Sequence, residues 1–244
     1  MNINNSLTKQ AQPRKLENRD PVLAAIESPK FQTWFKGSVV VDDSGSPLVV
    51  YHGTRDLEFS AFDSCKISDN GRFEGAGFYF TTDKSVANGY GEKGRVISAL
   101  LRITNPLPYS APAFDTTQMT NLILSAAKIE STTEDTSWQD GFLSNFADTY
   151  STSLHVAAAK AATYFESEST ALDQLGSLMG SGVSAQVCNQ ALFESLGYDG
   201  YVSSGYQNLG QAGGTIWVAT NPRQIKSATL NTGEFDPLNP NFDG

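Results

Sequence analysis

Residues 48–54 read Leu-Val-Val-Tyr-His-Gly-Thr, an apolar run that ends in a histidine followed by a glycine. The β-branched and aromatic residues predict a strand over Leu48–Tyr51, paired through a turn-forming stretch with a strand over Ser38–Val41. At such a strand end the histidine ring is presented to a ligand, and Gly53 lets that ligand approach the backbone. The competing interpretation is a structural histidine that caps a turn.

An aromatic strand follows a pair of glycines in the stretch Gly75–Asp83. The pattern predicts a glycine loop, a strand over Gly77–Thr81 and a short helix over Lys84–Tyr90. Tyr79 and Tyr90 then lie on either side of that helix and can approach each other across a slot. Two phenol rings so placed can stack on a flat, uncharged heterocycle. The alternative is that these rings only fill the core.

The remaining elements indicate an α+β fold. Further strands are expected at Val96–Ile103, Tyr201-Val202, Thr215–Ala219 and Ile225–Leu230. Between the groups of strands, residues 116–196 are rich in alanine and predict three or four helices, with breaks near Ser131 and near Gly180. Strands that flank a helical block favour α+β over a doubly wound sheet.

Composition restricts the classes of protein. The 244 residues carry a net charge of −9, which argues against binding to duplex nucleic acid because a basic face is needed to neutralise phosphates. No run of about 18 apolar residues is present to span a membrane, and the polar start lacks the apolar core of a secretory signal, so we expect a cytoplasmic protein. Two cysteines, Cys65 and Cys188, and two histidines exclude a disulfide framework and a Cys- or His-rich metal centre.

The sequence also suggests how the chain is divided. Residues 1–19 lack periodicity and are expected to form a disordered arm, and Asp20-Pro21 carries a helix start signal. We expect one domain over residues 20–236, with a helical insertion at about 110–196. Residues 237–244, rich in proline and asparagine, are expected to form an extended tail.

These segments, in this order, resemble the ADP-ribosyltransferase superfamily, in the poly(ADP-ribose)-polymerase-like branch that has a His-Tyr-Glu triad. The sequence is most similar to ADP-ribosyltransferase-like domains in phage and mobile-element polyvalent proteins. The resemblance covers about residues 30–107 and 190–236. It is carried by Trp34-Phe35, Pro47 to Thr54, Gly197-Tyr198-Asp199-Gly200-Tyr201 and Pro222-Arg223-Gln224-Ile225-Lys226-Ser227-Ala228. It implies a split β-sheet around an NAD cleft, with NAD as substrate and no metal.

The resemblance assigns roles residue by residue. His52 matches the triad histidine, which hydrogen-bonds the ribose hydroxyls of NAD. Gly53 matches the glycine whose backbone holds the nicotinamide amide, and Thr54 takes the position where the family often has serine. Tyr79 matches the triad tyrosine, and Tyr90 the second tyrosine that encloses nicotinamide.

The third triad position departs from the pattern, because Ile216 stands where the family has glutamate. That glutamate accepts a hydrogen bond from a ribose hydroxyl and stabilises the positive charge that develops as nicotinamide leaves. Thr215 does not replace it, since strand alternation directs it to the other face. Loss of one such electrostatic group typically costs about 10²–10³ in rate. The mono-ADP-ribosylating branch of the polymerase family often carries isoleucine here and is proposed to take a carboxylate from its substrate.

The expected function is mono-ADP-ribosyl transfer from NAD to a protein acceptor, by a phage or mobile-element protein that acts on host targets. Its location would be the host cytoplasm or the virion. The alternatives are a catalytically inactive, structural virion protein with this fold, and an NAD glycohydrolase that uses water as acceptor. Of the other candidates, Ser85 is expected near the nicotinamide amide, Asp199 in a turn, and His155 on a helix surface. Glu74 is expected as a solvated loop charge, and Glu194 flanks Gly197-Tyr198.

Overall fold

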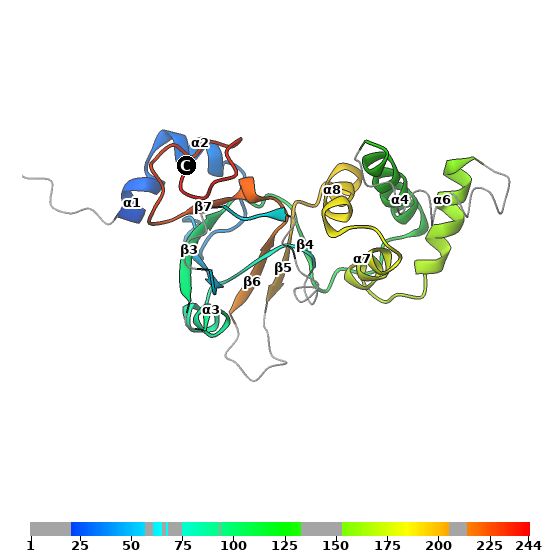
Figure 1. Ribbon diagram of the computed structural model, residues 1–244, viewed down its shortest axis with the longest axis horizontal. Helices are drawn as coiled ribbons and strands as arrows, with labels where there is room; N and C mark the ends of the chain where they lie inside the picture. Colours follow the sequence, from blue (N-terminus) through cyan, green and yellow to red (C-terminus); the bar gives the residue numbers. More distant parts are fainter. Residues whose placement is uncertain are drawn as a thin grey trace, which may run out of the picture.

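A curled sheet of seven strands forms the centre of the molecule (Figure 1). The computed structural model describes residues 21–56, 61–64, 67, 75–92, 94–132, 153–204 and 214–244. The strands are β1 (Val50–Thr54), β2 (Phe78–Thr81), β3 (Arg95–Leu101), β4 (Pro106–Pro108), β5 (Gly200–Ser204), β6 (Thr215–Ala219) and β7 (Ile225–Ser227). Their order is β4-β5-β6-β2-β1-β3-β7, and only the β4–β5 pair is parallel.

The sheet divides between β1 and β2. Across these two fully described strands the ladder holds one residue pair, Tyr51 with Thr81. By contrast, β1 pairs with β3 along its whole length, and β2 pairs with β6 along its whole length. The expected α+β class and the split arrangement are therefore confirmed, with the opening at the end of β1 that carries His52.

The α-helices are α1 (Pro21–Ile26), α2 (Pro29–Phe35), α3 (Lys84–Gly91), α4 (Thr116–Glu130), α6 (Leu154–Ala162), α7 (Ala171–Gly180) and α8 (Ala185–Leu196). Helices α1 and α2 lie at one end of the sheet, α3 at the opposite end, and the other helices form a block beside it (Figure 1). Short 3-10 turns, η4 (Thr163–Phe165) and η6 (Pro222–Gln224), follow α6 and β6. Side-chain caps begin most of them; Asp115, for example, forms a capping box with Gln118 at the start of α4. The predicted breaks after Glu130 and after Gly180 are confirmed.

Three apolar clusters hold these layers together. The largest joins helices α4, α6, α7 and α8 to one face of the sheet through residues such as Leu107, Tyr201 and Val218. A second covers the other face and includes Phe62, Phe80 and Trp217. The third contains the expected packing residues of α2, Phe31, Trp34 and Phe35. Within the described chain, none of the helices is long and apolar enough to cross a membrane.

Several expected boundaries differ from the structure. The predicted pairing across the turn is confirmed only in part, by the antiparallel Val41–Pro47 bridge and the hydrogen bond from Leu48 N to Val40 O. Residues 38–40 form no strand and dock instead on the end of β3, where Ser38 Oγ donates to Leu101 O and Val39 N donates to Ile103 O. The returning strand accordingly starts at Val50 rather than Leu48. The expected last strand is also too long, because β7 ends at Ser227, whose hydroxyl oxygen accepts hydrogen bonds from the next backbone amides and turns the chain. The predicted arm over residues 1–19 lies outside the described residues.

Candidate functional site

His52 lies on β1 at the opening of the sheet. Its register partner is Ile97, which places the ring on the face of the sheet that carries Phe80. Its Nδ1 lies 2.8 Å from the backbone oxygen of Tyr79. Because a carbonyl oxygen only accepts, Nδ1 carries the proton and Nε2 is the acceptor in the neutral ring. The imidazole thus links β1 to β2 where the backbone ladder stops.

The environment of His52 favours the neutral imidazole. Burial lowers its pKa, and the hydrogen bond to Tyr79 O partly opposes this effect. The ring packs against Phe62, with centroids 5.0 Å apart, and against Phe80, at 5.4 Å. These ring contacts and the hydrogen bond to Tyr79 O orient the imidazole, and a neutral Nε2 has the lone pair that can accept from a hydroxyl group.

Gly53 and Thr54 pack tightly against helix α3. A methyl group at position 53 would lie 1.8 Å from the backbone oxygen of Ala87 and 2.6 Å from the backbone nitrogen of Gly91. Only glycine lets β1 and α3 come this close. Thr54 ends the strand, and its hydroxyl oxygen accepts from the backbone nitrogen of Asp56 at 3.1 Å. The glycine after the histidine thus has a packing role in addition to the predicted ligand role.

Tyr79 is fixed on the opposite face of the sheet from His52. The alternation along β2 places Phe78 and Phe80 in the cluster around His52, whereas Tyr79 packs against the helical cluster. Its hydroxyl donates to the backbone oxygen of Gly75. Gly75 has a φ of +99°, and a methyl group there would meet the ring of Tyr201 at 2.6 Å. The glycine before the strand therefore positions Tyr79 by allowing this close packing.

The second predicted tyrosine lies apart from the first. Tyr90 is on the last turn of α3 and is 65% exposed, and no ring contact joins it to the equally well described Tyr79. Ser85 is engaged elsewhere, since its amide and hydroxyl both donate to Asp83 at the cap of α3. The stacking of nicotinamide between Tyr79 and Tyr90 remains a prediction.

Ile216 shares a face of the sheet with Tyr79. It pairs with Thr81 on β2, two residues along from the Tyr79–Val218 pair, and is half-buried against the helical cluster. Pleat alternation directs Thr215 to the other face, as predicted.

Among the weaker candidates, Asp199 is structural. Its carboxylate accepts from the backbone nitrogens of Thr104 and Asn105, at 2.9 Å and 2.8 Å, and from the Thr104 hydroxyl. It therefore fastens the loop after β3 rather than serving as an acid. His155 is exposed, as predicted, and Glu194 is exposed as well. Glu74 and most of the glycine-rich stretch 205–214 lie outside the described residues.

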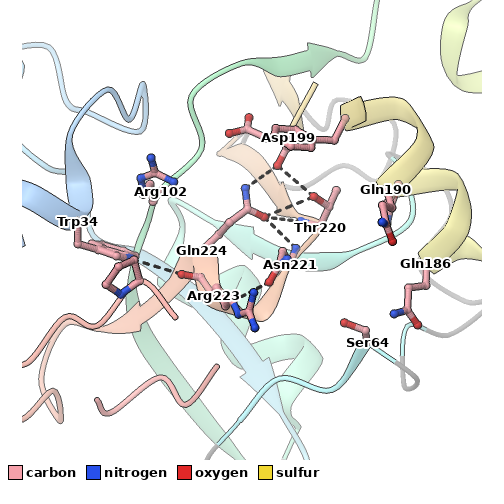
Figure 2. A pocket seen from close by; sticks show the side chains of 13 residues that line it. Trp34, Ser64, Arg102, Gln186, Gln190, Asp199, Thr220, Asn221, Arg223 and Gln224 are labelled. Carbon is pink, nitrogen blue, oxygen red and sulfur yellow. Dashed lines mark hydrogen bonds between the residues drawn. The ribbon is translucent and has the colours of Figure 1, made fainter. Parts of the chain in front are cut away.

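A cavity of about 320 Å³ opens at the other end of β6, between η6, α2 and α8 (Figure 2). It is lined by Trp34, Ser64, Arg102, Gln186, Asn189, Gln190, Phe193, Asp199, Thr220, Asn221, Arg223, Gln224 and Pro237. None of the predicted site residues lines it. Figure 2 shows Gln224 turned inward to the backbone oxygen of Asp199 and to the turn after Thr220. Much of its polar wall is thus occupied in holding the β6–β7 turn.

Phe62 was missed by the sequence reasoning. It is 5% exposed and touches both His52 and Phe80. It lies in a stretch of mixed apolar and polar residues without helical or strand periodicity, so no pattern of apolar residues marks it as buried. Its place in the site depends on a contact across the fold.

The described residues contain no group of three or more His, Cys, Asp or Glu side chains that could hold a metal ion. Comparison with curated proteins and with solved structures gives no match. The family model described as "ADP-Ribosyltransferase in polyvalent proteins" matches residues 42–235, most of the chain, including His52, Tyr79 and Ile216. This family uses NAD as its substrate. The chain therefore belongs to the ADP-ribosyltransferases of polyvalent-protein type.

Proposed function

We propose that the protein transfers a single ADP-ribose unit from NAD to a protein acceptor, with the site at the opening between β1 and β2. The observation that carries this proposal is the family match over residues 42–235, which contains all the residues assigned to the site. Single transfer rather than chain elongation is proposed because the resemblance assigns Ile216 to the position of the glutamate.

In the proposed reaction, His52 and Gly53 hold NAD, and the tyrosines hold nicotinamide. The neutral Nε2 of His52 accepts from a ribose hydroxyl, in keeping with the tautomer set by Tyr79 O. The ring of Tyr79, fixed through its hydroxyl, supplies one apolar wall, and Tyr90 supplies the other when ligand is present. The bond from ribose to nicotinamide breaks with its electron pair going to nicotinamide. The acceptor nucleophile then bonds to the ribosyl carbon and loses its proton.

The proposal is tested by introducing a glutamate at position 216. If Ile216 occupies the triad position, Ile216→Glu places a carboxylate beside the ribosyl cation and raises nicotinamide release from NAD by about 10²-fold. Thr215→Glu is the matched control, because it adds the same charge to the opposite face of the same strand. Equal rates for the two variants and the unaltered protein would refute the assignment of Ile216.

The fate of the ADP-ribose unit distinguishes transfer to protein from NAD hydrolysis and from a structural role. Incubation with labelled NAD and a lysate is expected to label protein, and the label should be lost in Tyr79→Ala. Nicotinamide release without labelled protein would instead identify an NAD glycohydrolase. Absence of NAD binding, together with stable incorporation into a virion, would favour a structural role. We further propose the host cytoplasm or the virion as its location.

A further inference from the structure

Residues 237–244, which follow the family match, lie beside α2 and β7 (Figure 1). The sequence predicts an extended tail here, whereas the structure shows two turns and a bridge that pack onto the sheet. Asn241 pairs with Ala61 in an antiparallel bridge, and Phe242 O accepts from the backbone nitrogen of Ser227 on β7 at 2.6 Å. Phe242 is only 3% exposed. The segment is therefore part of the folded core.

Lys226 fastens this segment. The side chain is fully buried, and its Nζ donates to the backbone oxygens of Asn239 at 3.0 Å, of Asn241 at 2.9 Å, and of Gly244. Three acceptors satisfy all three protons of an ammonium group. Burial lowers the pKa of Lys226, while Asp236 and Asp243 act to raise it. If residues 239–244 were displaced, the buried ammonium group of Lys226 would lose these acceptors, which costs free energy.

The segment reaches His52 through one intermediate ring. Phe242 packs edge-on against Phe62, with centroids 6.2 Å apart, and Phe62 packs edge-on against His52 at 5.0 Å. Phe62 also contacts Phe78 at 5.1 Å, so it is wedged between the sheet and residues 239–244. The Ala61–Asn241 bridge holds the backbone next to Phe62.

We propose that residues 239–244, fastened by Lys226, position the His52 imidazole for NAD by holding Phe62 against it. The inference rests on the proposed function for its reference to NAD. Phe62 and Phe242 are positioning residues, since they act through His52. A charged group, Arg95 on β3, lies beside these rings, with its Cζ 6.0 Å from the centroid of Phe242. Arg95 is left unchanged in all the variants described next, so that its charge does not contribute to the difference between them.

The test uses the two histidines of the chain as probe and reference. Imidazole signals of the full protein are followed by NMR against pH, with the exposed His155 as internal reference. In Phe242→Leu, looser packing of Phe62 admits water, so the pKa of His52 rises toward its ordinary value. Lys226→Met is expected to act in the same direction.

Phe114→Leu is the matched control, because Phe114 is a buried phenylalanine of the helical cluster without contact to His52. Its His52 titration should equal that of the unaltered protein. Unchanged His52 titration in both Phe242→Leu and Lys226→Met, or an equal change in Phe114→Leu, would overturn the proposal.

NAD titration of the same proteins separates this inference from the proposed function. We expect Phe242→Leu to bind NAD about tenfold more weakly, which corresponds to about 1.4 kcal/mol, and Phe114→Leu to bind normally. If the unaltered protein binds no NAD, the proposed function fails, and the NMR result still decides whether the segment positions His52. If Phe242→Leu changes the His52 titration but binds NAD normally, the positioning role for NAD is overturned.

Discussion

Gly53→Ala tests the packing at the centre of the site. The backbone φ at Gly53 is one that other residues adopt, so the substitution acts through space alone. The new methyl group would lie 1.8 Å from Ala87 O, 2.6 Å from Gly91 N and 2.9 Å from the carbonyl carbon of Ala87. All three atoms belong to the backbone of α3. No side-chain rotation relieves the overlap, and α3 must move away from β1.

The size of the effect follows from this displacement. Ordinary van der Waals contact begins at 3.4 Å, so the helix backbone must retreat by roughly 1.6 Å. Overpacking of this kind typically costs 1–3 kcal/mol, and rigid backbone partners place Gly53→Ala at about 3 kcal/mol. For a chain of this length, that lowers the melting temperature by about 6–12 °C. NAD affinity should fall too, because α3 carries Tyr90.

Thermal and urea unfolding of Gly53→Ala and Gly89→Ala provide the assay. Gly89 lies in the same helix and has no atom within 4 Å of an added methyl group. Since alanine favours helix over glycine by about 1 kcal/mol, Gly89→Ala should be as stable as the unaltered protein or more so. A Gly53→Ala protein with unchanged stability would refute the packing argument and leave the ligand role as the reason for this glycine.

Three further predictions concern buried polar groups. Asn189→Ala removes two buried hydrogen bonds, one of them from the Tyr201 hydroxyl at 2.7 Å, and should cost about 2–4 kcal/mol in urea unfolding. The pKa of His52 is lowered in the folded state, so its contribution to stability is complete above about pH 6.5 and is lost as the pH falls through the folded pKa. Below pH 6.5 the urea midpoint of unfolding should therefore fall less in His52→Gln than in the unaltered protein. Burial raises the pKa of Cys188 to about 12, so in a Cys65→Ser background a thiol reagent should react at pH 8 only after unfolding.

Local sequence pattern predicted the strands and helices that have a regular apolar periodicity or a clear capping residue. The strand over Thr215–Ala219 and the start of the helix at Lys84 agree with the structure, because apolar periodicity and capping residues are local signals. Strand β4 was missed, since two of its three residues are prolines, which seldom occur within strands. Its pairing with β5 is decided by tertiary contact.

In the candidate site, too, local sequence pattern indicated some residues and missed others. The sequence proposes His52, Gly53 and Tyr79 as site residues; the structure places His52 and Gly53 on β1 beside the opening and joins His52 to the backbone oxygen of Tyr79, with the Tyr79 side chain on the opposite face of the sheet. It offered no sign that Phe62 and Phe242 pack against one another beside the histidine, because that contact joins segments about 180 residues apart in a chain of 244. Such long-range contacts have no signature in local periodicity.

Calorimetric titration of NAD into the unaltered protein, Tyr79→Ala and Tyr164→Ala tests the central claim most directly. Tyr164 is 65% exposed and lies on the helical block, so Tyr164→Ala removes an equal ring away from the opening between β1 and β2. We predict NAD binding by the unaltered protein and by Tyr164→Ala, and its loss in Tyr79→Ala. No binding by the unaltered protein, or undiminished binding by Tyr79→Ala, would contradict it.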